Sequence, residues 1–175
     1  MKHQSFSGTM ANRKTARRFT RRAKLLLVFF LFFTAQSLFA QSKYVKKYRP
    51  MADSLSTVYG VPVSIILAVA ILESGSGTSR NCKLLNNHFG IVGKNDLMKT
   101  KRIKTRYKQY PDSLASYVDF CKLMTRKKFY KKLRDNSDYI LWAEAISNAG
   151  YSEVPEYWKT KVVETIRKNK LSKFD

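Results

Sequence analysis

The stretch that decides the fold runs from Pro62 to Ser79 and reads PVSIILAVAILESGSGTS. Proline suits the first turn of a helix, where its missing N–H costs nothing. From Val63 to Leu72 every residue except one serine is apolar, and two glycines within three residues follow Ser74. A helix that is apolar all round is a buried one. The stretch therefore predicts a buried central helix over residues 63–74.

Glu73 is the only acid of this predicted helix, and it shares a face with Val69 and Ala70. Desolvation on that face disfavours the carboxylate, and the negative end of the helix dipole acts in the same direction. A carboxylic acid that keeps its proton near neutral pH can protonate the leaving oxygen of a glycoside. The alternative at this point is a buried structural Glu paired with a Lys or Arg.

Helices are expected to dominate the rest of the chain, with one minor β element. Apolar spacings of three and four residues and the positions of Gly and Pro predict helices over 43–59, from Asp112 or Ser113 to Met124, over 139–149, and from Pro155 to about Lys168. Two β-prone pieces, 88–92 and 102–107, are joined by 93–96 and suit a small hairpin. The fold class is α+β and mostly α.

The N-terminus has the pattern of a secretory signal. Residues 1–24 hold eight Lys and Arg and no acid, LLLVFFLFF follows at 25–33, and small residues end the segment near Ala40. The apolar run is shorter than the ~20 residues of a spanning helix, and no Cys near its end offers a lipid attachment point. We expect cleavage after Ala40, no stable membrane anchor afterwards, and an exported domain of residues 41–175 in the periplasm or outside the cell.

The strongly basic composition calls for an anionic partner. The whole chain has a formal net charge of +22, and residues 41–175 keep about +14 because all 12 acids lie there. An exported protein meets the polyanions of the cell envelope rather than nucleic acid. The alternative is a solvated surface that serves solubility.

Cys82 and Cys121 are the two cysteines of the chain. In an exported protein they can form a disulfide worth about 3–4 kcal/mol, or stay as two buried thiols. Their spacing suggests no metal site, and acid catalysis on a glycan needs no cofactor.

Two further clusters suit a carbohydrate site. Asn86 to Ile91 reads NNHFGI, in which turn-forming amides precede an aromatic residue and a glycine that permits close backbone approach. We expect Asn87, Phe89 and Gly90 to contact sugar there, and a structural role for the lone His88. Tyr151 follows Gly150 at a predicted helix end, where its hydroxyl can bind a sugar or its ring can close the core.

Read together, the three clusters resemble the glucosaminidase family, family 73 of the glycoside hydrolases, found in bacterial autolysins and flagellar rod proteins. The matching segments are ILAVAILESGSGTS, NNHFGI, Tyr107 to Phe120 and AISNAGYSEVPEYWKTKVVETIRKNKLSKFD, and the resemblance runs from about residue 43 to residue 175. It implies a lysozyme-like domain with a small β-hairpin lobe, acting as a monomer on β-1,4-linked N-acetylglucosamine of peptidoglycan. Glu73 matches the family's acid, and Tyr151 matches its active-site tyrosine.

One departure from the family concerns the second catalytic group. The family's hairpin usually carries a second Glu, whereas residues 97–106 contain no acid, and Asp96 is the nearest candidate. Asp96 could activate a water, or the substrate's own 2-acetamido group could attack the anomeric carbon. Glu153, in a Ser-Glu-Val segment where the family has Ala-Thr-Asp, is a more distant acid.

Two other functions compete with a hydrolase. A lytic transglycosylase also uses one Glu at a helix end, but its typical Gly-Leu-Met-Gln-like segment is replaced here by NNHFGI. A cationic wall-binding protein that has lost activity is the non-enzymatic alternative. The reaction products distinguish the three.

Overall fold

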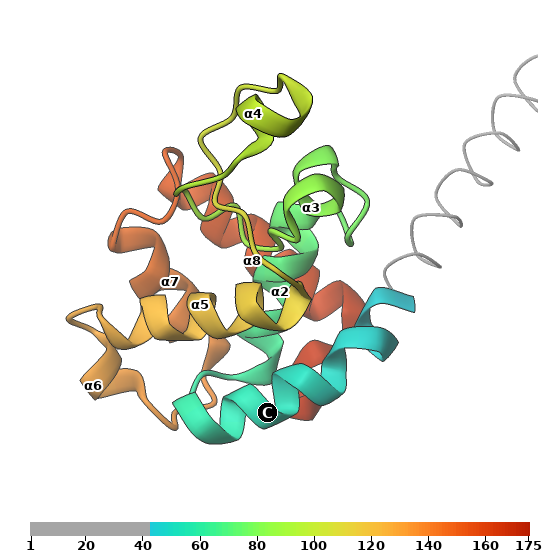
Figure 1. Ribbon diagram of the computed structural model, residues 1–175. Coiled ribbons are helices and arrows are strands. Elements are labelled where there is room, and N and C mark those ends of the chain that lie inside the picture. Colours follow the sequence, from blue (N-terminus) through green and yellow to red (C-terminus); the bar gives the residue numbers. More distant parts are fainter. Residues whose placement is uncertain (1–42) are drawn as a thin grey trace, which may run out of the picture. The chain divides into compact units, whose positions relative to one another are not determined.

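The computed structural model describes residues 43–175, so the predicted signal segment lies outside the described residues. The described part is a bundle of helices, with the longest connections on either side of α4 (Figure 1). In chain order they are an N-terminal helix (43–59), α2 (Val63–Ser74), α3 (Arg80–Leu85), α4 (Leu97–Lys101), α5 (Ser113–Thr125), α6 (Tyr130–Leu133), α7 (Tyr139–Asn148), α8 (Pro155–Asn169) and the 3₁₀ helix η1 (Leu171–Phe174).

The five predicted helices are confirmed, each within one or two residues of its predicted ends. The prediction missed α3, α4, α6 and η1. These elements have four to six residues each, which is too short to show a helical period in the sequence.

Helix α2 forms the centre of the core, as its sequence predicted. Its residues from Val63 to Ile71 are all buried. It packs against α7, α8 and η1 (Figure 1). Gly75 ends the helix with a left-handed φ of 56°, and its N–H bonds the carbonyl of Ile71. The apolar stretch thus fixes α2 in place, and its last turn reaches the surface at Glu73.

The C-terminal segment closes the other end of α2. Pro62 occupies the N-cap position and offers no side-chain cap. Asp175 supplies the missing acceptor, because its Oδ1 accepts the backbone N–H of Ser64 at 2.8 Å. A carboxylate near a helix N-terminus satisfies an unpaired N–H and interacts favourably with the helix dipole.

The predicted hairpin is not confirmed. Val92 and Tyr107 form an isolated antiparallel bridge, and residues 43–175 contain no longer strand. Residues 97–101 form α4 instead, and the first residue of this helix, Leu97, is buried. The amide of Asn95 donates to the carbonyls of Thr105 and Tyr107, so a side chain replaces part of a strand ladder. We call residues 93–106 the α4 lobe.

Three further observations bear on the sequence predictions. Cys82 and Cys121 are both buried free thiols, and burial raises the pKa of Cys121 to about 12. Within the described residues, no cluster of three or more His, Cys, Asp and Glu side chains could hold a metal ion. No helix of this part of the chain has the length and apolar character to cross a membrane.

Candidate active site

The site begins with Glu73 in the last turn of α2, where its side chain is half-buried. Its Oε1 accepts a hydrogen bond from the indole Nε1 of Trp158 at 2.8 Å. Burial raises the pKa of Glu73, and the bond from Trp158 offsets part of that rise. The environment therefore favours the protonated acid that the sequence predicted.

Gly90 lies directly against the carboxyl group of Glu73. Its φ is +64°, a left-handed conformation that favours glycine. A Cβ at this position would approach Oε2 of Glu73 to 3.2 Å, which is tighter than ordinary van der Waals contact. The glycine therefore lets the backbone of this segment come close to the acid.

Tyr151 ties the loop after α7 to the same segment. Its hydroxyl donates to the carbonyl of Phe89 at 2.7 Å, and its ring packs 5.1 Å from the ring of Trp158. Burial, with a smaller contribution from nearby Glu73, raises the pKa of Tyr151 far above its usual value. Tyr151 is thus a neutral phenol whose proton points at a backbone carbonyl.

A cavity of about 200 Å³ joins these groups. Four predicted site residues line it, Glu73, Phe89, Gly90 and Tyr151. The remaining lining residues are Ile91, Val92, Leu123, Lys127 and Gly150. The structure therefore brings the three sequence clusters together around one opening beside Glu73, with the end of α5 as its remaining wall.

Two predicted site residues do not line this cavity. Asn87 is 2% exposed, and its amide nitrogen donates to the carbonyls of Ile91 and Lys108. Asn87 therefore holds the backbone of the segment that lines the cavity, without lining the cavity itself. Asp96 is exposed at the start of α4. The alternative acid Glu153 is also outside the lining and forms an exposed ion pair with Arg106.

His88 has the structural surroundings that the sequence predicted. Its Nδ1 lies 2.7 Å from the hydroxyl of Tyr44, and its Nε2 lies 3.0 Å from Oγ of Ser113. Burial, with a smaller contribution from Lys47, lowers the pKa of His88 to about 4. A neutral, fully bonded imidazole fixes the residue next to Phe89.

Sequence reasoning missed two residues of the site. Trp158 falls within the last predicted helix, and nothing in the sequence indicated its bond to Glu73. Lys127 lines the cavity and donates to the carbonyl of Ala149 at 3.1 Å. It is one of 34 Lys and Arg residues, so composition offered no way to single it out.

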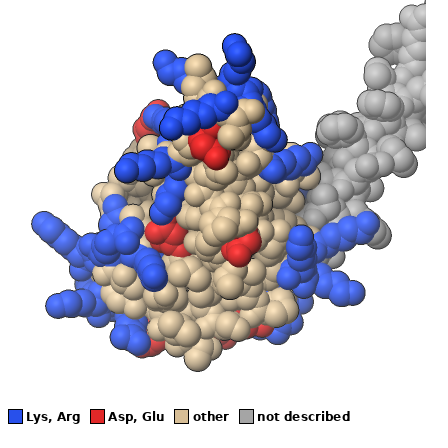
Figure 2. All heavy atoms as spheres, in the orientation of Figure 1, with Lys and Arg blue, Asp and Glu red and all other residues tan. Residues whose placement is uncertain are grey.

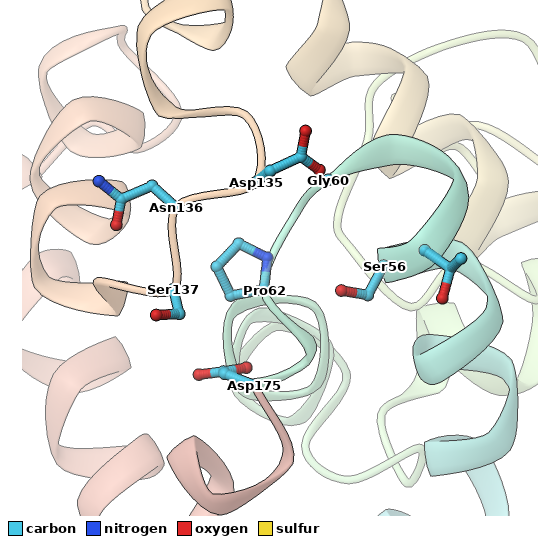
Figure 3. A pocket seen from close by; sticks show the side chains of 8 residues that line it. Ser56, Gly60, Pro62, Asp135, Asn136, Ser137 and Asp175 are labelled. Atoms are coloured by element: carbon cyan, nitrogen blue, oxygen red, sulfur yellow. The ribbon is translucent and has the colours of Figure 1, made fainter.

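A second cavity, of about 270 Å³, lies at the opposite end of α2 (Figure 3). Figure 3 shows Asp135 and Asp175 on either side of Pro62, at the start of the helix. The helix separates this cavity from Glu73 by about 16 Å, at 1.5 Å per residue. Burial raises the pKa of Asp175, and the bond from Ser64 acts in the opposite direction. The contacts here close the helix end, and Glu73 borders the smaller cavity.

Comparison with known proteins identifies the class to which this arrangement belongs. A carboxyl group at the wall of a cavity, in surroundings that raise its pKa, suits the general acid of glycoside hydrolysis. The model of the glucosaminidase family, described as mannosyl-glycoprotein endo-beta-N-acetylglucosaminidase, matches residues 49–171, well over half of the chain. The chain belongs to this family of glycoside hydrolases.

Two relatives of the chain are named as a glucosaminidase and as a peptidoglycan hydrolase. The chain is 30% identical over 141 residues to the exo-glucosaminidase LytG of Bacillus subtilis, covering 71% of this chain and 50% of LytG. It is 27% identical over 124 residues to the peptidoglycan hydrolase FlgJ of Escherichia coli K12, covering 61% and 40%. The chain thus spans half or less of the length of these relatives.

Solved structures support the fold. The catalytic domain of the autolysin Auto from Listeria monocytogenes has a TM-score of 0.64 at 20% identity, with 78% of this chain and 88% of that chain covered. The glycoside hydrolase domain of FlgJ from Salmonella typhimurium has a TM-score of 0.58 at 27% identity, with 74% and 88% covered. These neighbours confirm the mostly helical, lysozyme-like fold, without confirming the hairpin lobe.

Proposed function

We propose that the chain is an exported peptidoglycan hydrolase that cleaves the β-1,4 bond after N-acetylglucosamine, with Glu73 as general acid. The observation that carries the proposal is the half-buried carboxyl of Glu73 at the wall of the cavity, in surroundings that raise its pKa. Family membership and the activities for which LytG and FlgJ are named support the substrate. The functional unit is residues 41–175, acting as a monomer after removal of the signal segment.

In the proposed reaction, Glu73 donates its proton to the glycosidic oxygen as the bond to the anomeric carbon breaks. The leaving sugar departs as an alcohol, and positive charge develops on the ring that remains. Water then adds to the anomeric carbon, and its surplus proton returns to the Glu73 carboxylate. The products are a new alcohol and a new reducing end on N-acetylglucosamine.

For the second catalytic group we favour the substrate's own 2-acetamido group over Asp96. Glu73 is the only acid among the described residues that line the cavity, while Asp96 lies outside that lining. An acetamido oxygen that attacks the anomeric carbon needs no second carboxylate from the protein. If Asp96→Asn releases peptidoglycan fragments within about twofold of the wild-type rate, this route is supported. A fall of that rate by about a hundredfold or more would assign the role to Asp96.

Two basic segments flank the cavity and support an anionic polymer as substrate. The α4 lobe holds six Lys and Arg and one acid, and residues 126–134 hold six and none. Val92, next to the lobe, and Lys127, in the second segment, both line the cavity. Among the described residues, ion pairs engage only Arg106 and Arg134 of these twelve cations.

Figure 2 shows Lys and Arg side chains over α4 and at the edge that carries α6, with uncharged surface and patches of Asp and Glu on the face between them. We propose that they contact carboxylates of the stem peptides on a glycan strand. Retention on purified peptidoglycan should then fall as salt rises through the range in which exposed charges are screened. Retention that does not change with salt concentration would contradict the proposed contact with stem-peptide carboxylates.

The experiment for the proposed function is digestion of purified peptidoglycan by residues 41–175, with the released fragments identified by mass spectrometry. We expect reducing N-acetylglucosamine ends. Anhydro-muramic ends would assign the chain to the lytic transglycosylases, and binding without release would assign it to a non-enzymatic role. The mass of the mature protein recovered from the producing cell tests cleavage after Ala40.

A further inference from the structure

We infer that Trp158 is a positioning residue that directs the catalytic proton of Glu73 onto one of its two carboxyl oxygens, Oε2. The inference rests on the proposed role of Glu73 as the general acid. It adds a residue whose role the sequence did not indicate and that acts through Glu73 without touching substrate.

The two oxygens of Glu73 have different surroundings. Oε1 accepts the indole N–H of Trp158 at 2.8 Å. Oε2 lies on the side of Gly90, and no described residue forms a hydrogen bond with it. An indole N–H can only donate, so the oxygen that accepts it has less capacity for a second proton. The neutral acid therefore carries its proton on Oε2, beside the glycine that lines the cavity.

Trp158 is held firmly enough to select one oxygen. The residue is 5% exposed in the first turn of α8, and its backbone N–H bonds the carbonyl of Val154 at 3.0 Å. Its ring packs 5.1 Å from that of Tyr151, at an interplanar angle of 43°. A donor that is fixed before the reaction needs no reorganisation when charge develops.

The same bond helps after the proton has left. Hydrogen bonds to a charged acceptor are stronger than those between neutral groups, so the indole stabilises the Glu73 carboxylate more than the neutral acid. Burial opposes the carboxylate, and the indole offsets part of that effect. Burial therefore favours the protonated form of Glu73, while the indole makes loss of the proton easier.

The decisive change is replacement of Trp158 by 3-benzothienylalanine, which keeps the ring shape and substitutes sulfur for the N–H. Loss of the donor should raise the pKa of Glu73, so the alkaline limb of the kcat profile should move up by about one pH unit. The maximal rate should fall about tenfold, because the proton is no longer confined to Oε2.

Trp142 provides a matched control, since it is the only other tryptophan of the chain. Its Nε1 donates to the carbonyl of Asn136 at 2.8 Å, and its ring contacts are with Phe129 and Tyr130, which do not line the cavity beside Glu73. The same replacement at Trp142 also removes one buried indole donor. It should lower thermal stability without moving the pH profile, whereas an equal change of the profile at both positions would overturn the inference.

A readout that does not depend on turnover separates this inference from the proposed function. The ¹³C resonance of the Glu73 carboxyl can be titrated in the protein without substrate, and its midpoint should rise only with the replacement at Trp158. An unchanged midpoint overturns the role of Trp158, even if the enzyme is active. Absence of peptidoglycan release by the wild type at every pH, with a raised midpoint in the variant, would instead overturn the proposed function alone.

Discussion

Each end of α2 carries a partly buried carboxyl group beside a cavity, and the helix dipole acts on the two groups in opposite directions. At the N-terminal end, Asp175 accepts the backbone N–H of Ser64, where the helix dipole favours an anion. At the C-terminal end, Glu73 meets the negative end of the dipole and accepts only the indole N–H of Trp158. One helix therefore holds a capping carboxyl at its start and, at its end, the carboxyl that we propose as the proton donor.

The carboxyl group that we propose as reactive is the one with an unpaired oxygen, and it borders the smaller of the two cavities. The cavity beside Asp175 is the larger, about 270 Å³ against about 200 Å³. Its carboxyl groups are engaged, Asp175 with Ser64 and Asp135 with Arg134. Oε2 of Glu73 has no hydrogen-bond partner among residues 43–175, and it lies against the glycine that borders the smaller cavity.

The largest expected effect comes from crowding the C-terminal end with Gly90→Ala. The added Cβ would lie 3.2 Å from Oε2 of Glu73, so we expect about a hundredfold loss of kcat in peptidoglycan digestion. Gly150→Ala is the control, because its φ is +75° and its Cβ would meet no atom within 4 Å. Gly150→Ala should be destabilised to a similar extent, but its kcat should fall only a few-fold. Equal losses of kcat in the two variants would mean that backbone strain, and not the contact with Glu73, is responsible.

A second effect concerns stability at the same end. Burial raises the folded-state pKa of Glu73 above its ordinary value of 4.5, so the folded protein binds its proton more tightly than the unfolded chain. This contribution is complete below pH 4.5 and is lost as pH rises through the raised pKa. Glu73→Gln avoids the loss, so its Tm at pH 7 should exceed that of the wild type by about 5 °C.

The difference in Tm between Glu73→Gln and the wild type should close below about pH 4, where both side chains are neutral. Calorimetry at pH 7 and pH 4 measures it. A Tm difference that is the same at both pH values would contradict a buried, proton-binding Glu73.

The smallest effect is expected at the N-terminal end. Asp175→Ala removes the acceptor of the Ser64 N–H and should lower the free energy of unfolding by about 1 kcal/mol. Asp135→Ala is the control for the same cavity, since its partner Arg134 is an exposed neighbour, and we expect it to cost less than about 0.5 kcal/mol. Denaturant unfolding measures both, and equal costs would remove the capping role of Asp175.

The sequence predicted the parts of this comparison that depend on local pattern. The apolar run before Glu73 located α2 and the end of that helix, and apolar spacing located α8. The bond from Trp158 to Glu73 spans 85 positions and the bond from Ser64 to Asp175 spans 111, so both depend on how helices pack and left no local signal.

The predicted hairpin is not confirmed, and here too the deciding contacts leave no local signal in the sequence. β-prone residues at 88–92 and 102–107 indicated two strands, whereas the chain between them contains the five-residue helix α4. The side chain of Asn95 bonds two carbonyls across the loop, and that pairing cannot be read from residue pattern.

The most direct test of the central claim is the release of reducing N-acetylglucosamine ends from purified peptidoglycan by three proteins: the wild type, Glu73→Gln and Asp175→Asn. We predict release by the wild type, release within about twofold by Asp175→Asn, and a loss of about a thousandfold in Glu73→Gln with its fold intact. Release by Glu73→Gln near the wild-type rate, or its loss in a folded Asp175→Asn, would contradict the division of roles between the two ends of α2.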